Sequence, residues 1–458
     1  MKNELHNYDI FPKVFPVGKE VKITVKPLGE HAALKDSEKL TLFVLGLEDG
    51  AIRDFPERKN NNTAAFEVAA DGTITLNYVF PKEQQYFLRF VNSDTDKRVL
   101  QLSVYALAED LCGRYPFIGD LHMHTCYSDG KQAPDIVCAN YRKTGYDFIV
   151  ISDHGCYASS LKAISAYKDV PIELNIVQGE EVHMPKVEGY INDTHIVNFG
   201  GKYSVNALID SSDQNRVLGD GKEFRSFEGF PCPDTITLDE YHRQVTELAE
   251  TLNIPDGIEK FTYASCVWIF NHIRAAEGLG IFPHPYWISN VYQIPENLIN
   301  YMLETQPFDA FEVLGGEVYY EHNGFQTQKY YEMRAKGYDF PIVGSTDSHS
   351  SVNSRGSHIA STMVFSPENT TEQLIASIKD KYSVAVDTIS AEFRLVGDLR
   401  LSKYACFLLN EFFPLHNDLC FEEGRAMKDY VCGVEGAKET LEFIGGRMKK
   451  QREKYFAF

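Results

Sequence analysis

The sequence lacks the features that mark membrane and secreted proteins. No segment among its 458 residues approaches the roughly 18 consecutive apolar residues that a membrane-spanning helix needs. The N-terminal stretch MKNELHNYDIFPKVFPVGKEV has no apolar core of the kind found in signal peptides. The nine cysteines are odd in number and include no C-x-x-C pair, which argues against a disulfide framework. These absences predict a protein of the reducing cytoplasm that has no contact with a membrane.

Basic side chains are also scarce. The 45 Lys and Arg residues face 65 Asp and Glu residues, which gives a net charge of −20. Such a surface repels nucleic-acid backbones, so the composition argues against long nucleic acid as a partner. It does not exclude a small phosphorylated substrate, because a local cluster of cations can dominate a pocket. The length is enough for two or three domains, and the 43% hydrophobic content is ordinary for a globular protein.

The first part of the chain, residues 1–112, predicts a β-sandwich-like domain. It contains short runs rich in β-branched and aromatic residues, several of which alternate with polar residues. The runs cover residues 21–29, 40–47, 64–70, 73–80, 85–92 and 99–107. Asp71-Gly72 separates the third run from the fourth, and this dipeptide suits a two-residue hairpin turn. This region shows no cluster of catalytic residues, so a structural or binding module is expected here.

Residues 113–390 show a different pattern, in which strand-like runs alternate with helical ones. This alternation predicts an α/β domain built on a largely parallel sheet, either open or closed into a barrel. Residues 200–265 interrupt it with a loop rich in Gly, Ser and Asp, followed by helices expected at 237–252 and 259–278. Residues 391–458 form amphipathic helical segments, and we expect this tail to pack on the outside of the barrel.

Polar residues recur at the ends of the predicted strands of this second region. In GDLHMHTCYSDG, His122 and His124 stand at positions i and i+2, so both side chains leave a strand on the same face. Functional groups of α/β folds gather at the C-terminal ends of strands. The candidate metal ligands are His122, His124, Asp129, His154, Glu181, His195, His284, Asp347 and His349. Imidazoles mixed with carboxylates suit Zn, Mn or Fe better than Mg or Ca.

Five motifs in this region occur in a fixed order: H-x-H followed by S-D-G, then D-H-G, G-x-E, H-P and D-x-H. In this order they resemble the PHP (polymerase and histidinol phosphatase) family over roughly residues 115–390. The resemblance implies a distorted seven-stranded barrel that holds three divalent metal ions. It assigns His122, His124, Glu181 and Asp347 to the first ion. Glu181, His195 and His284 hold the second, and Asp129, His154 and His349 hold the third.

Several assignments have a competitor in the sequence. Glu180 adjoins Glu181, and the G-x-E spacing favours Glu181. His183 shares the strand face of Glu181, whereas His195 is followed by an apolar pair, Ile196-Val197, that resembles the family's strand; we favour His195. A phosphate clamp normally contains arginine, and Arg355 is the best candidate for contact with the substrate phosphate. Tyr286 and Trp287 follow His284-Pro285 and either line a leaving group or belong to the core.

The resemblance implies a metal-dependent phosphoesterase that acts on a small metabolite or nucleotide through a metal-bridging hydroxide. Two alternatives remain open. One is a metal-dependent hydrolase of a non-phosphate bond, and the other is a non-catalytic metal-binding module. All nine ligand positions carry a ligand-capable residue, which argues against the second alternative. The sequence contains no motif that identifies the substrate. A homo-oligomer is possible.

Overall fold

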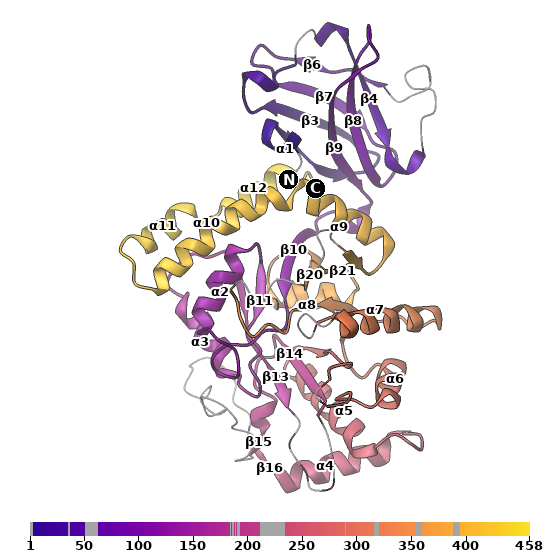
Figure 1. Ribbon diagram of the computed structural model, residues 1–458, viewed down its shortest axis with the longest axis vertical. Helices are drawn as coiled ribbons and strands as arrows, with labels where there is room; N and C mark the ends of the chain where they lie inside the picture. Colours follow the sequence, from indigo (N-terminus) through magenta and orange to yellow (C-terminus); the bar gives the residue numbers. More distant parts are fainter. Residues whose placement is uncertain are drawn as a thin grey trace. The chain divides into compact units, whose positions relative to one another are not determined.

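The computed structural model describes residues 3–34, 37–50, 63–183, 185, 187, 189, 193–210, 234–288, 290–315, 320–352, 360–387 and 394–458. They form a mixed α/β structure, as predicted, and divide into two compact units (Figure 1). Unit 1 comprises Met1–Tyr115, Leu399–Leu419 and Gly446–Phe458, and unit 2 comprises Pro116–Asp398 and Cys420–Gly445. The C-terminal residues therefore contribute to both units. The division into three domains stays a prediction.

Unit 1 contains two sheets, one of four strands in the order β1-β3-β7-β6 and one of five in the order β2-β9-β8-β4-β5. The strands are β1 Tyr8–Phe11, β2 Val14–Pro16, β3 Glu20–Pro27, β4 Leu40–Gly46, β5 Thr63–Ala64, β6 Glu67–Val68, β7 Ile74–Val79, β8 Gln84–Asn92 and β9 Arg98–Leu107. Both sheets contribute to a single hydrophobic core, with Ile23 and Leu76 from the first sheet and Val44 and Leu88 from the second. Unit 1 is thus layered, with one apolar core between its sheets.

The hairpin expected at Asp71-Gly72 is present, but its loop is longer than predicted. Strands β6 and β7 pair antiparallel. The Ala69 amide donates to Thr73 O at 2.8 Å, and the Gly72 amide donates to Ala69 O at 2.9 Å. Gly72 has φ of 81°, a conformation that glycine adopts without steric cost. A three-residue loop of this kind, closed by a left-handed residue, joins the strands in place of the two-residue turn.

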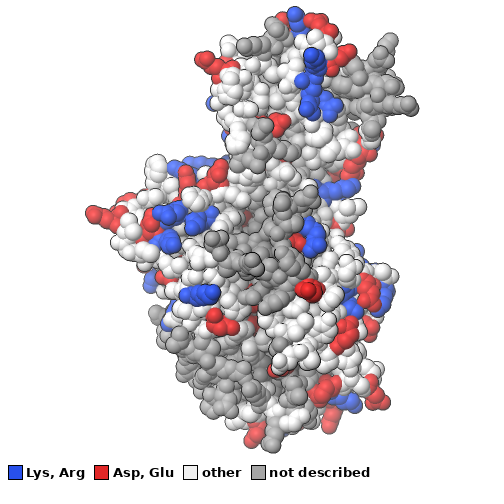
Figure 2. All heavy atoms as spheres, viewed as in Figure 1, with Lys and Arg blue, Asp and Glu red and all other residues white. Residues whose placement is uncertain are grey.

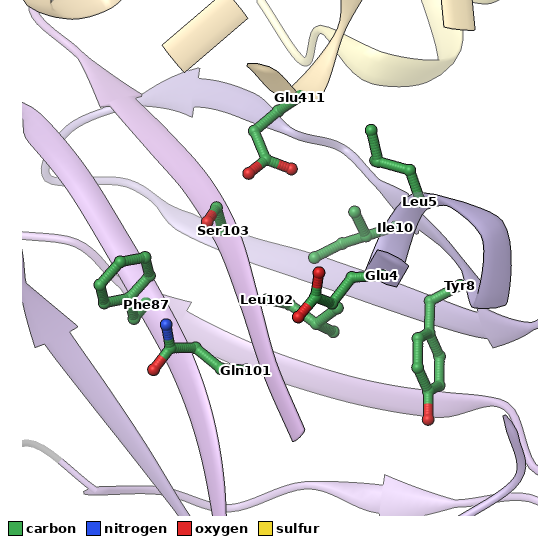
Figure 3. A pocket seen from close by; sticks show the side chains of 9 residues that line it. All are labelled: Glu4, Leu5, Tyr8, Ile10, Phe87, Gln101, Leu102, Ser103 and Glu411. Atoms are coloured by element: carbon green, nitrogen blue, oxygen red, sulfur yellow. The ribbon is translucent and has the colours of Figure 1, made fainter. Parts of the chain in front are cut away.

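Unit 1 also encloses a cavity of about 270 Å³ (Figure 3). Helix α1 (Asn3–Asn7), strands β1, β8 and β9 and helix α9 (Leu399–Glu411) supply its walls. The lining residues are Glu4, Leu5, Tyr8, Ile10, Phe87, Gln101, Leu102, Ser103 and Glu411. Figure 3 shows the carboxylates of Glu4 and Glu411 coming from different helices. The lining contains no histidine, in contrast to the strand ends of unit 2.

Unit 2 is built on a six-stranded sheet in the order β12-β11-β10-β20-β21-β22 and a five-stranded sheet in the order β13-β14-β17-β18-β19. The strands are β10 Tyr115–Asp120, β11 Phe148–Val150, β12 Asn175–Val177, β13 Gly179–His183, β14 His195–Phe199, β17 Leu279–Phe282, β18 Ala310–Leu314, β19 Ile342–Gly344, β20 Ala360–Ser366, β21 Ser383–Asp387 and β22 Arg394–Val396. The short strands β15 (Ile209–Asp210) and β16 (Ile236–Thr237) pair separately.

The sheets of unit 2 are mixed, whereas a largely parallel sheet was expected. Strands β10, β11 and β12 run parallel, as do β17, β18 and β19. Strand β14, however, pairs antiparallel with both β13 and β17. Parallel neighbours need a crossover of a dozen or more residues, usually a helix, and only residues 184–194 separate β13 from β14. This short connection explains the antiparallel pair.

The described strands of unit 2 form two large sheets and the small β15-β16 pair, and no closed barrel is found among them. The sheets nevertheless approach each other at the strand ends that carry the predicted ligands. Isolated parallel bridges join Met123 to Ser348 and His154 to Glu181. The Asp347 amide also donates to His122 O at 2.9 Å. The ends of β10, β11, β13 and β19 are therefore held together.

Two of the helices expected from the sequence are present. Helices α4 (Leu238–Thr251) and α5 (Lys260–Ala275) lie where the sequence predicts them, and α5 packs against β14 and β17. The Thr237 hydroxyl caps α4 by accepting from the Glu240 amide at 3.1 Å. The remaining helices are α2 Pro134–Lys143, α3 Ala158–Ala166, α6 Glu296–Thr305, α7 Tyr320–Ala335, α8 Thr371–Lys379, α10 Phe413–Val431, α11 Ala437–Ile444 and α12 Arg447–Tyr455. Most of the predicted loop insertion, residues 211–233, lies outside the described residues.

The surface carries charges of both signs. On the face drawn in Figure 2, acidic and basic side chains are interspersed, so the net charge of −20 is not gathered there into a single patch. Among the described helices, none is both long enough and apolar enough to cross a bilayer.

Candidate metal centre

The nine predicted ligands of unit 2 come together at the ends of its strands. His122 and His124 follow β10, His154 follows β11, and Asp347 and His349 follow β19. Glu181 lies in β13, His195 begins β14, His284 follows β17 and Asp129 lies in the loop after β10. Together with His183 they form four overlapping groups, in each of which one ligand atom from every residue lies within 4.8 Å of those of the others. The groups are His124, Asp129, His154 and His349; His154, Glu181, His183 and His195; His122, His124 and Glu181; and His122, His284 and Asp347.

The carboxylate of Glu181 lies at the centre of this cluster and is fully buried. Because its two oxygens lie close to four of the histidines, we call it the hub of the cluster. Its Oε1 lies 2.8 Å from His195 Nδ1, 3.2 Å from His284 Nε2 and 3.4 Å from His122 Nε2. Its Oε2 lies 2.5 Å from His154 Nδ1. One carboxylate therefore faces imidazoles delivered by four strand ends.

Two further carboxylates flank the hub. Asp347 Oδ1 lies 2.9 Å from His124 Nε2 and 3.3 Å from His122 Nε2. Asp129 Oδ1 lies 3.2 Å from His349 Nε2, and its Oδ2 lies 3.6 Å from His154 Nε2. The Asp129 side chain is 56% exposed, whereas that of Asp347 is 6% exposed. The cluster is thus open to solvent on the side of Asp129.

The atoms of the cluster suit shared cations better than mutual hydrogen bonds. His122 Nε2, His195 Nδ1 and Glu181 Oε2 are buried and have no hydrogen-bond partner among the described residues, although other polar atoms lie close to them. Ligands of a tetrahedral zinc, each about 2.0–2.1 Å from the ion, stand about 3.3 Å apart. Several separations match this value, including His122 Nε2 to Asp347 Oδ1 at 3.3 Å and His284 Nε2 to Glu181 Oε1 at 3.2 Å. The donor set therefore fits divalent metal ions.

Backbone strain is concentrated at two of these residues. His284 has φ of 22° and Asp347 has φ of 53°, both in the left-handed region that non-glycine residues rarely occupy. Such conformations cost on the order of 1–3 kcal/mol each, and they persist where the surrounding structure fixes them. Both residues aim their side chains into the cluster, so the strain accompanies their placement as ligands.

The ionisable groups of the cluster perturb one another strongly. Burial raises the pKa of Glu181, but the charges of His195, His154 and His122 outweigh burial and hold that pKa well below its usual range. Burial lowers the pKa of His154, but Glu181 and Asp129 outweigh burial and raise it to about 10. The buried carboxylates thus require positive charge beside them, and bound cations would supply it.

Glu312, in β18, lies directly against two of the predicted ligands, and the sequence analysis did not select it. Its side chain is fully buried, its Oε2 lies 3.1 Å from His122 Nδ1, and its Oε1 accepts from the His284 amide at 3.1 Å. A carboxylate behind a ligand histidine fixes the tautomer and orients the ring. A Cβ at Gly315 would lie 1.9 Å from Glu312 Oε1, so this position needs glycine. The only signal in the sequence was a carboxylate inside the apolar run DAFEVLG.

The adjacent glutamates Glu180 and Glu181 have different partners in the structure. Glu180 points away from the cluster and accepts from the Ser204 hydroxyl and the Val205 amide, both at 2.7 Å. Asp153, beside His154, plays a similar structural part, since it accepts from the Thr125 amide at 2.7 Å and holds the loop that carries His124 and Asp129. Glu181 is thus the member of its pair that faces the histidines.

His183 and His195 both lie beside Glu181. They are directly paired across β13 and β14, and their rings stack at 4.2 Å. His195 Nδ1 is 2.8 Å from the Glu181 carboxylate, and His183 Nε2 is 4.0 Å from it. His183 Nε2 instead lies 2.7 Å from His154 Nδ1. The distances favour His195, and both remain candidate ligands. Arg355 lies outside the described residues.

Comparison with known proteins gives matches among solved structures alone. No family model and no curated protein matches the sequence. The chain is similar to a two-domain protein from Bacteroides vulgatus described as containing a PHP-like metal-dependent phosphoesterase, with 15% identity over 60% of this chain and a TM-score of 0.37. It spans 65% of that protein, slightly under two thirds of its length.

Two other similar structures have different descriptions. One, from Bifidobacterium adolescentis, is described as a metal-dependent phosphoesterase; it shares 15% identity over 57% of this chain and 96% of its own, with a TM-score of 0.32. The other is endonuclease Q in complex with duplex DNA that carries an abasic lesion, with 13% identity over 58% of this chain and 57% of its own and a TM-score of 0.28. All three TM-scores lie below 0.5, so the function proposed below rests on the side chains of the centre.

Proposed function

We propose that this protein is a metal-dependent phosphoesterase of the PHP type that hydrolyses a phosphate ester of a small metabolite or nucleotide. The observation that carries the proposal is the convergence of nine predicted residues, eight of them from five separate motifs and the ninth His195, into one cluster with the spacing of metal ligands. Strained backbone at His284 and Asp347 supports it, because strain of this kind gathers at functional sites.

We further propose that strands β10, β11, β13, β14, β17, β18 and β19 surround this centre as a distorted barrel that holds three divalent ions. The bridges that join the ends of β10 to β19 and β11 to β13 support this arrangement. The first two ions would share Glu181, with His122, His124 and Asp347 on one side and His195 and His284 on the other. Asp129, His154 and His349 would hold the third.

Divalent ions bound here would polarise a phosphoryl oxygen and supply a nucleophile from water at neutral pH. The chain's own residues set the conditions for this chemistry. Three such ions bring a formal charge of about +6, and Asp129, Glu181 and Asp347 return about −3, so the centre attracts an anion despite the acidic composition. Entry is expected on the side of Asp129, the exposed ligand. Arg355 stays our candidate for contact with the phosphate.

Phosphate release from a panel of phosphomonoesters and phosphodiesters, with Mn²⁺ or Zn²⁺ supplied, tests the proposal. We expect release by the wild type and a loss of at least about a thousandfold in Asp347→Ala, since this change removes a ligand carboxylate. His31→Ala is the control, because it removes an exposed imidazole of unit 1 that hydrogen-bonds Asn7. Single-stranded and duplex oligonucleotides in the panel test the expectation that long nucleic acid is a poor substrate. If metal-loaded protein released no phosphate from any ester, the proposal would be wrong, and hydrolysis of a non-phosphate bond would become the favoured hypothesis.

A further inference from the structure

An exposed apolar surface lies on the segment that follows β17, together with one residue of α7. Its four most exposed members are large apolar side chains that a folded protein usually hides. They are Val291, which is 73% exposed, Ile288 at 46%, Phe325 at 43% and Tyr292 at 41%. Together with Trp287, which is partly buried, we call them the apolar rim.

The rim is an ordered surface with its own support. Ile288 and Tyr292 form an isolated antiparallel bridge. The buried ring of Tyr286 lies beneath the rim, with its centroid 5.7 Å from that of Tyr292 and 5.8 Å from that of Phe325. The Gln293 amide donates to Trp287 O at 2.9 Å and closes the loop. These contacts place Tyr292 and Phe325 around the Tyr286 ring, with Ile288 bridged to Tyr292 and Val291 next to Tyr292 in the chain.

Both ends of this loop contact the candidate metal centre. The loop begins at His284, and the Trp287 ring centroid lies 5.9 Å from that of His284. At the other end, Gln293 Nε2 lies 3.3 Å from His195 Nε2. The two histidines are the predicted ligands that share the second ion with Glu181. The loop that carries the apolar rim therefore adjoins the two histidines predicted to hold the second ion.

We propose that the apolar rim binds the leaving group, and that the substrate is a phosphate ester whose alcohol carries an aromatic or other apolar group. This inference rests on the proposed phosphoesterase function. A phosphoryl group held at the ions leaves its alcohol on the adjoining surface, and the adjoining surface here is apolar. Burial of an apolar alcohol against Trp287 and its neighbours would remove apolar surface of both partners from water. A strongly polar alcohol would bury little apolar surface here, so contact with the rim would not strengthen its binding.

Two esters that differ only in the aromatic ring test this inference. Benzyl phosphate and ethyl phosphate are both esters of a primary alcohol, so a difference in kcat/KM reports on the ring. We expect the wild type to favour benzyl phosphate by about tenfold or more, which is within the range that an apolar pocket can discriminate. Trp287→Ala and Val291→Ser should move the ratio toward one, with the metal content unchanged. Val99→Ser, at an exposed valine of β9, should keep the wild-type ratio.

Fluorescence gives a second readout that needs no turnover. The chain has two tryptophans, and Trp268 is only 5% exposed. We expect benzylphosphonate to change the emission of the metal-loaded wild type and of Trp268→Phe, and to leave that of Trp287→Phe unchanged. Ethylphosphonate should produce a much smaller change at the same concentration.

The outcomes separate this inference from the proposed function. Hydrolysis of both esters with equal kcat/KM, or an unchanged ratio in both rim variants, would overturn the inference and leave the phosphoesterase proposal standing. If metal-loaded protein hydrolyses neither these esters nor any member of the panel of phosphate esters, the proposed function fails, and the fluorescence titration alone decides whether the rim binds an apolar anion. Hydrolysis of other panel members but of neither test ester would overturn the inference alone. Rim variants that change the oligomeric state in size-exclusion chromatography, with the ester ratio intact, would make the rim a subunit contact and would also overturn the inference.

Discussion

Buried polar groups are treated differently in the core of unit 1 and in the metal centre of unit 2. In unit 1, Gln84 is 1% exposed, and its amide is used by protein atoms: Oε1 accepts from the Glu48 amide at 2.7 Å and Nε2 contacts the Tyr86 hydroxyl at 3.4 Å. In unit 2, Glu181 Oε2 and His122 Nε2 are equally buried, and their nearest polar neighbours are other predicted ligands: Oε2 lies 2.5 Å from His154 Nδ1, and His122 Nε2 lies 3.3 Å from Asp347 Oδ1. Gln84 thus forms ordinary hydrogen bonds, whereas the atoms of the unit 2 cluster face one another at the spacing expected for ligands of shared cations.

The strands of the two regions also differ in how their residues are buried. In β8, burial alternates along the strand, so one face meets the core and the other is partly exposed. In β18, all five residues are buried, including the carboxylate of Glu312. A charged group in a fully buried strand is tolerated only where it is paired. The pairing of Glu312 with His122 and with the His284 amide therefore belongs to the metal centre.

The largest effect is expected at the adjacent glutamates of β13. Glu181→Gln should lose most of the bound metal and at least about a thousandfold of phosphate release, because the carboxylate shared by two ions is gone. Glu180→Gln should keep the metal and lower the free energy of unfolding by about 1–3 kcal/mol, since it disturbs buried hydrogen bonds to Ser204 and Val205. Metal analysis and chemical denaturation of both variants measure the two effects. Equal metal loss in the two variants would contradict the assignment of Glu181 as the hub.

The next effect concerns Glu312. Glu312→Gln should weaken metal binding by about 10- to 100-fold, as is typical when the group behind a ligand histidine is changed. The apoprotein should unfold at nearly the same temperature, because glutamine can still accept from the His284 amide. Competition with a chromogenic chelator measures the affinity. Gly315→Ala should weaken binding in the same direction, since its Cβ would displace Glu312 Oε1. Full metal affinity in both variants would reduce Glu312 to a structural residue.

A smaller difference is expected between the stacked histidines. His195→Ala should weaken metal binding by about tenfold or more, whereas His183→Ala should change it only a few-fold, because a ligand atom matters more than a ring beside it. The distances to Glu181, 2.8 Å for His195 and 4.0 Å for His183, give the direction. Metal stoichiometry of the two variants, measured side by side, checks it. The reverse order would transfer the ligand role to His183.

The sequence predicts the elements of this molecule better than their pairing. The ordered motifs identified eight of the nine residues that converge in unit 2, and most of these residues follow the end of a strand. His195, which begins β14, was favoured over His183 only from the apolar pair that follows it. Glu312 was missed because a carboxylate in an apolar run does not reveal which histidine lies opposite. The antiparallel run of β14 was also missed, since strand direction depends on the length of a connection and on neighbours far away in the chain. The loop at Asp71-Gly72 shows the same limit on a smaller scale, because the turn signal predicts a hairpin and not the number of residues in its loop.

The smallest effect on the metal centre is expected from the core of unit 1. Leu88 is fully buried there, and Leu88→Ala should lower the free energy of unfolding by about 2–5 kcal/mol through lost burial and the cavity left behind. Metal content and phosphate release should stay at wild-type levels under native conditions, because Leu88 and the ligands belong to different compact units. Denaturation followed by circular dichroism, with metal analysis of the folded variant, measures both. If the variant lost its metal while still folded, the two units would be energetically coupled, and the core of unit 1 would have to be counted among the elements that stabilise the metal centre.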